Sequence, residues 1–495
     1  MEALKSAFLN PIKSFKLKYL PLLMVYFAYG ASGFSSIAET FWVKQHLNLD
    51  ATALVTLGVW LSIPWTIKMV FGQLVDSIPI LGSQRRAYVY IGAGLITIST
   101  ILMIGLVGNK DWIHFLPQQQ VYILASLLAV IGFVLQDVVA DAMSTEVVDR
   151  NQPKEEVERE LAMVQVLGRL ALSIAGFIVA GLGGWLAQIF SYETIFKIAL
   201  FIPLLSIIGV SIVKLDTPKP SAIDCKILCG GLVFAVFVVF MGYSEMPYAQ
   251  EIVFFVSLAV ISYMIKDVID DLDAETKRKI VIATIVIFVY RAMPGVGPGV
   301  TWWEIDILHF DKAFFGTLAQ IGSGLAILGM WFLSDWITKK PISWTLIMLT
   351  VVGTILSLPI VGMYYGLHHW TEEMFGFGAR TIALVDTAVE SPFGQLSMIP
   401  LLTLIAIYAP AGKRATWFAL MASMMNLALT AGGLLTKYLN EIFVVSRKVV
   451  QNGVVVSHAD YSQLGKLMII VTLVNFVVPI FTIWWLMMRK GEGVK

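Results

Sequence analysis

The chain has 495 residues, of which 58% are hydrophobic and only 14% charged, and its mean hydropathy is +0.79. Soluble domains carry about 25% charged residues, so this composition excludes a soluble protein and indicates a polytopic membrane protein in a lipid bilayer. The net charge of +1 gives no sign of a nucleic-acid partner. No metal, phosphate-loop or nucleophile motif is present, so we expect neither a cofactor nor an enzyme.

Apolar runs follow one another along the chain and predict an all-α membrane protein, because an unpaired strand cannot satisfy its backbone in lipid. The runs lie at about 20–43, 54–75, 87–108, 120–147, 160–190, 193–213, 227–243, 249–266, 279–304, 313–335, 341–364, 379–409, 415–440 and 465–488. We therefore expect a six-helix half over 1–215, a linker with a two-helix hairpin over 216–278, and a second six-helix half over 279–495. The expected number of spans is 12 to 14.

Basic residues gather in alternate loops, with Arg447 and Lys448 as the exception. The positive-inside rule then places both termini in the cytoplasm. No N-x-S/T sequence occurs, which favours a bacterial inner membrane or an organellar envelope over a eukaryotic cell surface.

The two halves look like a repeat. Aligning Lys18 with Lys279 needs no gap, and it places Tyr29 on Tyr290 and 40–42 on 301–303. Two related six-helix halves are the architecture of major-facilitator carriers, which hold the substrate near mid-membrane between the halves.

The stretch from Lys68 to Tyr88 joins the second and third runs and carries unusual charge. Such charge is costly in a membrane unless it is paired or wetted. Its glycines would permit close helix approach and a tight turn, and Asp76 can pair with Arg85 or Arg86. We interpret the segment as a cytoplasmic gate; the alternative is a purely topological basic loop. The gate residues are Lys68, Gly72, Asp76, Gly82, Arg85 and Arg86.

The fourth run places Asp137 and Asp141 on one helix face, because they are four residues apart. Two acids cannot both stay charged in a low-dielectric site without a partner. Arg169 is a candidate partner, with Gln165 one turn before it. We expect a proton-coupling or substrate site, and the alternative is a structural ion pair near the cytoplasmic mouth.

In the seventh run, Arg291 precedes a segment rich in glycine and proline, 294–299, that would break or loosen the helix. Arg291 could hold a carboxylate in bidentate fashion. Trp302 and Trp303 could stack on a flat ring or belong to an interfacial belt.

Three further acids are candidates for substrate binding or proton coupling. Asp386 and Glu390 lie four residues apart in the tenth run, and Glu39 lies near the outer end of the first.

The gate segment resembles the K-x3-G-x3-D-x2-P-x2-G-x2-R-R-x-Y pattern of the folate–biopterin transporter family of the major facilitator superfamily. The matching residues are Lys68, Gly72, Asp76, Pro79, Gly82, Arg85, Arg86 and Tyr88. Further matches are Asp137, Asp141, Ala142 and Glu146, then 303–306, then 415–426, so the resemblance covers about residues 18 to 440. Ser83, Gln84 and Ala87 depart from the family's usual residues.

The resemblance implies a secondary carrier with alternating access, coupled to protons, for folates or related pterins. The alternative is a major-facilitator carrier of another organic anion, such as a muropeptide or other aromatic metabolite. Asp137 or Asp141 would take the proton, or would accept hydrogen bonds from the N–H groups of a pterin. Arg291 or Arg169 would hold the substrate's carboxylate. By analogy with such carriers we expect a monomer.

Overall fold

The computed structural model confirms an all-α membrane protein. It describes residues 15–47, 49–80, 82–83, 85–148, 153–213, 225–244, 246–338, 340–394, 396–408, 414–451 and 454–489. Within these ranges, 11 helical stretches are long and apolar enough to cross a membrane. Regular strands in the described part of the chain are confined to one short antiparallel hairpin, β1 (Val449–Gln451) with β2 (Val454–Ser457).

The chain forms two compact units. The first comprises 1–43, 68–234 and 312–320, and the second comprises 44–67, 235–311 and 321–495. The two units are not consecutive halves of the chain, because residues 44–67 belong to the second unit and residues 312–320 belong to the first. The helices α3 (Ser36–His46), α11 (Cys225–Tyr243) and α15 (Lys312–Thr338) contribute residues to both.

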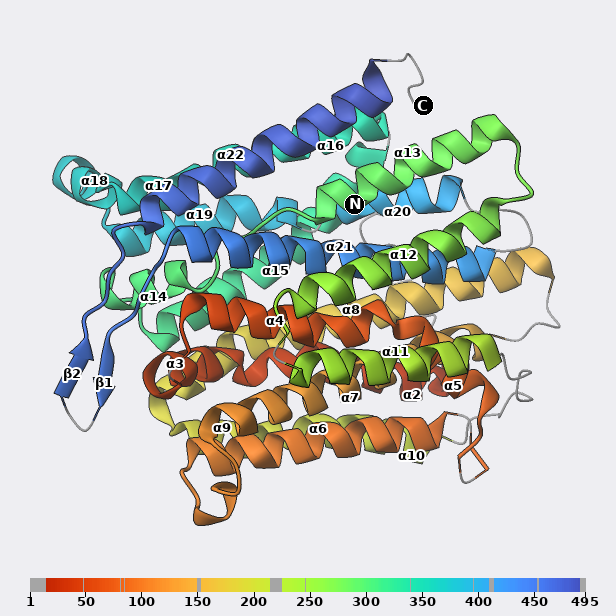
Figure 1. Ribbon diagram of the computed structural model, residues 1–495, viewed down its shortest axis with the longest axis horizontal. Helices are drawn as coiled ribbons and strands as arrows, with labels where there is room; N and C mark the ends of the chain where they lie inside the picture. Colours follow the sequence, from red (N-terminus) through yellow and green to blue (C-terminus); the bar gives the residue numbers. More distant parts are fainter. Residues whose placement is uncertain are drawn as a thin grey trace. The chain divides into compact units, whose positions relative to one another are not determined.

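The first unit is a bundle of long helices. Its elements are η1 (Leu17–Tyr19), α2 (Leu20–Ala31), η2 (Ser32–Ser35), α5 (Lys68–Ser77), α6 (Arg86–Val107), η3 (Asp111–Ile113), α7 (Gln118–Glu146), α8 (Lys154–Ile189), α9 (Tyr192–Ala199) and α10 (Phe201–Ile212). Helices α6 and α7 lie side by side (Figure 1), and α2 packs against α8 and α10. Gly92 and Gly132 allow this α6–α7 approach, because a Cβ at Gly132 would lie 2.7 Å from the carbonyl oxygen of Gly92.

The second unit contains more and shorter helices. Its elements are α4 (Ala51–Thr66), α12 (Ala249–Ile269), α13 (Ala274–Arg291), α14 (Gly299–Asp306), α16 (Ile342–Leu356), α17 (Leu358–Tyr364), α18 (Leu367–Phe375), α19 (Ala379–Gly394), α20 (Met398–Ile407), α21 (Arg414–Ile442), the hairpin β1–β2, α22 (Leu464–Ile483) and η4 (Trp484–Met488).

Helix α4 joins this second unit because it packs along α21. Two interhelical hydrogen bonds fix the pair: the Ser62 and Thr430 hydroxyls lie 2.7 Å apart, and Asn426 Nδ2 donates to the carbonyl of Trp65. Polar side chains commonly link helices within a bilayer in this way.

The seventh span is broken, as its glycines and prolines predicted. Helix α13 ends at Arg291, residues 292–298 leave the helical conformation, and α14 begins at Gly299. The first span changes at the matching place of the predicted repeat, where α2 gives way to the 3-10 turn Ser32–Ser35.

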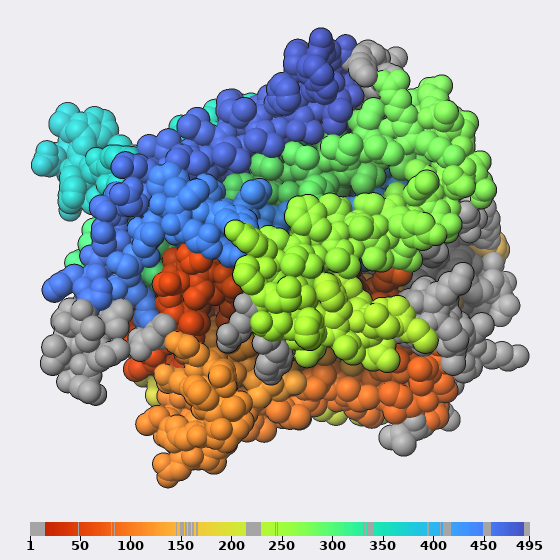
Figure 2. Space-filling view, in the orientation of Figure 1, coloured from red at the N-terminus to blue at the C-terminus, as the bar shows by residue number. Residues whose placement is uncertain are grey.

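The predicted hairpin between the halves forms two helices, α11 and α12. Helix α12 is long and apolar enough to span a membrane, whereas α11 contributes a shorter apolar stretch, Cys229–Gly242. Apolar side chains of α12 such as Phe255 and Tyr263 are exposed, at 64% and 72%, and its surface is visible in Figure 2. Such a surface suits contact with lipid.

Candidate functional site

A lysine and two acids form a compact cluster inside the first unit. Lys68 Nζ lies 2.5 Å from Asp137 Oδ2 and 2.6 Å from Asp141 Oδ2. The Tyr26 hydroxyl donates to Asp141 Oδ1 at 2.8 Å. The cluster therefore draws its groups from α5, α7 and α2, and holds two carboxylates against one ammonium group.

The local sequence explains how Lys68 reaches the acids. Helix α4 contains Pro64 and ends at Thr66, and α5 starts anew at Lys68 after the non-helical Ile67. Asp137 and Asp141 share one face of α7, as their spacing predicted. The Lys68 side chain is 24% exposed, that of Asp137 14% and that of Asp141 49%, so one side of the cluster is open to solvent.

Lys68, and not the candidate partner Arg169, makes the ion pairs with these acids, although the charge of Arg169 still acts on Asp137. Arg169 is exposed and makes no ion pair among the described residues. The side chain of Gln165 lies outside the described part. Lys68, one of the predicted gate residues, therefore contacts the acids of the fourth span.

A second charged cluster lies at Arg85, which is only 4% exposed. Its Nη2 lies 2.8 Å from Asp76, its Nε donates to Glu146 at 3.0 Å, and its Nη1 donates to the carbonyl of Val75. Of the two predicted partners for Asp76, Arg85 is therefore the one in contact. Arg86 instead donates to the backbone carbonyls of Val210 and Ser211.

The two gate glycines differ. Gly82 has a φ of +72°, within the turn closed by the Ile80–Ser83 bridge, which agrees with the predicted tight turn. Gly72 does not lie at a close helix approach, since a Cβ there would meet no atom within 4 Å. The prediction of close packing at Gly72 is corrected accordingly.

Trp302 and Trp303 are neither an interfacial belt nor an open stacking surface in this structure. They are 2% and 4% exposed and belong to the apolar core of the second unit, with Met363, Tyr461 and Leu464 among their cluster. The short α14 that carries them is covered by the chain that follows α21, so their role here is packing.

Glu39 is held within the first unit. Its Oε1 accepts a hydrogen bond from the Tyr122 hydroxyl of α7 at 2.8 Å. The structure does not bring Glu39 into the lysine–acid cluster through any hydrogen bond in its described part.

The second unit carries three ionisable side chains that lack an oppositely charged partner among the described residues. Arg291 Nη1 lies 2.9 Å from the sulfur of Met398, and its Nε is buried without a hydrogen bond. Asp386 Oδ1 is likewise buried without one. Glu390, one turn further along α19, lines a cavity of about 430 Å³. Intramembrane ionisable groups of this kind mark functional sites by default.

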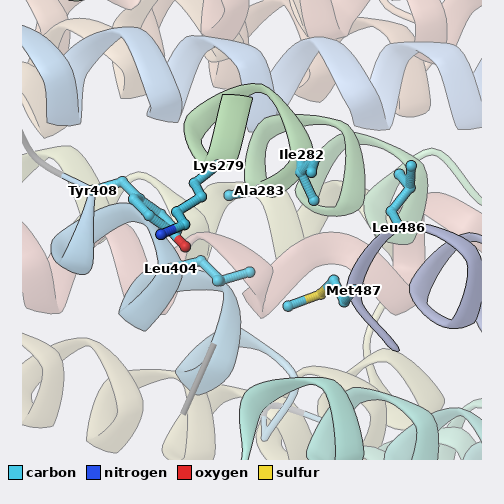
Figure 3. A pocket seen from close by; sticks show the side chains of 7 residues that line it. All are labelled: Lys279, Ile282, Ala283, Leu404, Tyr408, Leu486 and Met487. Carbon is cyan, nitrogen blue, oxygen red and sulfur yellow. The ribbon is translucent and has the colours of Figure 1, made fainter. Parts of the chain in front are cut away.

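A much smaller cavity, of about 10 Å³, lies between α13, α20 and η4 (Figure 3). Figure 3 shows the side chains of Lys279 and Tyr408 pointing toward one another, beside Leu404. A cavity of this volume holds about one water molecule, so it has no room for an organic substrate.

Sequence reasoning missed a charged cluster around Asp306. Its carboxylate lies 2.5 Å from Lys44 Nζ and accepts from the Tyr461 hydroxyl at 2.5 Å. Nearby, Arg447 donates to the backbone carbonyls of Lys44 and Leu47. The signal that could have found it is Arg447 itself, a basic residue in a loop where the positive-inside rule expects few.

The chain is similar in sequence to known transporters. The chain is 26% identical over 431 residues to the folate-biopterin transporter of Synechocystis sp., covering 85% of this chain and 75% of that protein. It is 24% identical to the probable folate-biopterin transporter 4 of Arabidopsis thaliana, covering 86% and 88%. It is 21% identical to folate transporter 1 of Plasmodium falciparum, covering 92% and 76%.

The fold is that of solved transporters. A POT family transporter crystallised with a thioalcohol-conjugated peptide superposes with a TM-score of 0.65 at 14% identity, covering 95% of this chain and 98% of that one. These relatives are transporters and not enzymes. The model of the BT1 family matches residues 29–493, which confirms the resemblance drawn from the gate segment. The chain belongs to the BT1 family.

Proposed function

We propose that this protein carries folates or related pterins across a membrane as a proton-coupled secondary transporter with alternating access. Relatives from three distant organisms are named folate or folate-biopterin transporters, which supports the substrate class. The observation that carries the coupling mechanism is Lys68 between Asp137 and Asp141.

The ion-paired groups of this cluster do not balance in charge. With Lys68 and both acids ionised, two carboxylates contact one ammonium, and the second positive charge, on Arg169, acts on Asp137 only from beyond ion-pair distance. Such an imbalance is unfavourable at Asp137, whose side chain is only 14% exposed. One proton on either carboxylate would neutralise the cluster, and Tyr26 supplies a hydrogen bond that orients Asp141 for this role.

The cluster also links helices that would have to move. Lys68 begins α5, and the acids lie in α7, so protonation of one acid weakens a contact between two helices. The Arg85 cluster ties the other end of α5 to the end of α7 through Asp76 and Glu146. Loss of both sets of contacts would free α5, and this is the conformational change that we assign to the gate.

Arg291 would hold a substrate carboxylate. Its guanidinium has a buried nitrogen without a hydrogen bond, and a bidentate carboxylate satisfies such a group well. We place both termini in the cytoplasm, from the distribution of basic loops, and propose that a monomer is the working unit.

Transport by proteoliposomes tests this proposal. Radiolabelled folic acid and biopterin are offered with and without an inward proton gradient, to wild type, to Asp137→Asn, and to the exposed-loop control Asp111→Asn. We expect saturable uptake that an uncoupler abolishes, that Asp137→Asn loses its dependence on the gradient, and that Asp111→Asn behaves as wild type.

Two results would count against it. Gradient-independent uptake by wild type would remove the proton-coupling role of the cluster. No uptake of either compound by folded protein would remove the pterin assignment and direct the search to other organic anions.

A further inference from the structure

The cavity of about 430 Å³ inside the second unit has no part in the coupling mechanism. We propose that it binds a small nitrogen heterocycle through paired N–H donors, the chemistry of the aminopyrimidinone ring of a pterin. Naming a pterin as the natural ligand rests on the proposed function; the donor chemistry rests on the cavity alone.

The cavity is built at the break in the seventh span. Tyr290 at the end of α13, and Met293 and Gly295 in the non-helical segment, form one wall. Helices α16, α17, α19 and α22 supply the others. A broken helix beside a cavity exposes backbone polar groups that a continuous helix would satisfy internally. The volume lies within the range of roughly 300–1,000 Å³ typical of ligand sites.

The wall from α16 presents oxygen atoms whose protons are already used. Thr350, Thr354 and Ser357 each donate to a backbone carbonyl of α16, at 2.8 Å in every case. Their remaining lone pairs can only accept. Thr350 is also hydrogen-bonded to Tyr290, so Thr354 and Ser357, which follow it along the lining, are the hydroxyls left to accept from a ligand.

Asn475 of α22 adds an acceptor that lacks a donor. Its Nδ2 donates to the carbonyl of Pro294 at 3.2 Å, which fixes the orientation of the amide. Its Oδ1 is buried and has no hydrogen-bond partner in the described part of the chain. A buried acceptor without a donor is uncommon in folded proteins and calls for an explanation. An N–H group of a bound ligand would donate the missing hydrogen bond to Asn475 Oδ1.

Glu390 gives the lining of the cavity its negative charge. It lines the cavity, and among the described residues it has no ion-pair partner. No lysine, arginine or histidine lies among the lining residues. A carboxylate with neutral acceptors around it repels an anion and attracts N–H donors, and it can accept two parallel N–H bonds from one planar ring. The glutamate end of a folate is therefore excluded from this cavity.

Binding measurements on the purified full chain test the proposal. The probes are biopterin, isocytosine (the bare aminopyrimidinone ring) and p-aminobenzoylglutamate, which lacks that ring. Glu390→Gln removes the charge and keeps the shape. Gly353→Leu fills the space, since a Cβ at Gly353 meets no atom within 4 Å. Gly94→Leu in α6 is the matched control, a helical glycine with equally open surroundings in the other unit.

We expect Gly94→Leu to bind biopterin and isocytosine with the same affinities as wild type. Gly353→Leu should weaken both by at least tenfold, and Glu390→Gln by about tenfold. Binding of p-aminobenzoylglutamate should not change in any variant. Melting temperatures close to wild type identify the variants that are folded.

The inference is overturned if wild type fails to bind isocytosine, or if folded Gly353→Leu and Glu390→Gln bind both ring compounds as wild type does. The proposed function can fail separately. Loss of isocytosine binding in the cavity variants would support the cavity site even if wild-type proteoliposomes took up no folate or biopterin.

Discussion

Lys68 and Asp137 lie 69 positions apart in the chain, yet the Lys68 Nζ is 2.5 Å from Asp137 Oδ2. The contact joins the first residue of α5 to the middle of α7. Helix α4 ends at Thr66, and the non-helical Ile67 separates it from α5. The ion pair therefore fixes the start of α5 against α7.

Replacing Lys68 tests the value of this contact. Lys68→Met leaves two carboxylates without their shared cation and removes the ion pairs that join α5 to α7. We expect destabilisation of about 1–3 kcal/mol, between the values for exposed and buried pairs, and at least a tenfold loss of folate uptake. Thermal unfolding in detergent and proteoliposome uptake measure the two effects.

Lys110→Met is the matched control for Lys68→Met. Lys110 pairs with Glu193 at 3.1 Å with its side chain 43% exposed, so its loss should cost less than about 1 kcal/mol. Equal effects of the two substitutions would show that the position of Lys68 has no special role.

Asp76→Asn tests the gate. Asparagine keeps the size of Asp76 but removes the charge that faces the buried guanidinium of Arg85. Glu146 still neutralises Arg85, so we expect the protein to fold and reach the membrane. Uptake should nevertheless be abolished, because Arg85 loses one of its two carboxylate partners, Asp76 and Glu146.

Asp273→Asn is the control for Asp76→Asn, since Asp273 caps α13 through its bond to the Thr276 amide and asparagine caps helices equally well. Uptake at the wild-type rate in Asp76→Asn would contradict the gate assignment.

Local features of the fold could be predicted from the sequence. The break after Arg291 follows from glycine and proline at 294–299, whose effects on a helix do not depend on distant residues. The Asp76–Arg85 contact spans nine residues of one short loop, so the sequence reduced it to two alternatives.

The rest depends on long-range packing. Spacing shows that Asp137 and Asp141 share a helix face, but the orientation of that face toward Lys68 is set by how α5 packs on α7. Trp302 and Trp303 are buried by the segment around Tyr461, far away in the sequence. No pattern in either segment indicates that the two regions meet.

Arg447→Met tests the charged cluster around Asp306 that the sequence did not reveal. The Arg447 guanidinium is buried, donates to the carbonyls of Lys44 and Leu47, and lies 5.8 Å from the centre of the Trp302 ring. Methionine fills part of the space but leaves both carbonyls without donors. We expect destabilisation of about 2–3 kcal/mol, as for hydrogen bonds to charged groups.

The neighbouring Lys448 is exposed, so Lys448→Met should change stability by less than about 0.5 kcal/mol. The two variants are compared by thermal unfolding under one set of conditions. A stable Arg447→Met would show that the hydrogen bonds of Arg447 to Lys44 and Leu47 contribute little to stability.

Acid should destabilise the protein through Glu160, at the start of α8 and outside the spanning segments. Burial opposes its ionisation, but hydrogen bonds from Lys16 and Tyr19 and the nearby Lys18 outweigh burial and lower the pKa of the carboxyl to about 2. Glutamate in an unfolded chain has a pKa of about 4.3. The folded state thus binds the proton less tightly, so this contribution is complete above about pH 4.3 and is lost as the pH falls toward 2.

Glu160→Gln should therefore melt at a lower temperature than wild type at pH 6, and the difference should shrink steadily as the pH is lowered from 5 to 2.5. Glu156→Gln, an exposed glutamate on the same helix, should follow the wild-type curve throughout. A difference between wild type and Glu160→Gln that stays constant with pH would mean that the lysines near Glu160 do not lower its pKa, and that the substitution acts through packing alone.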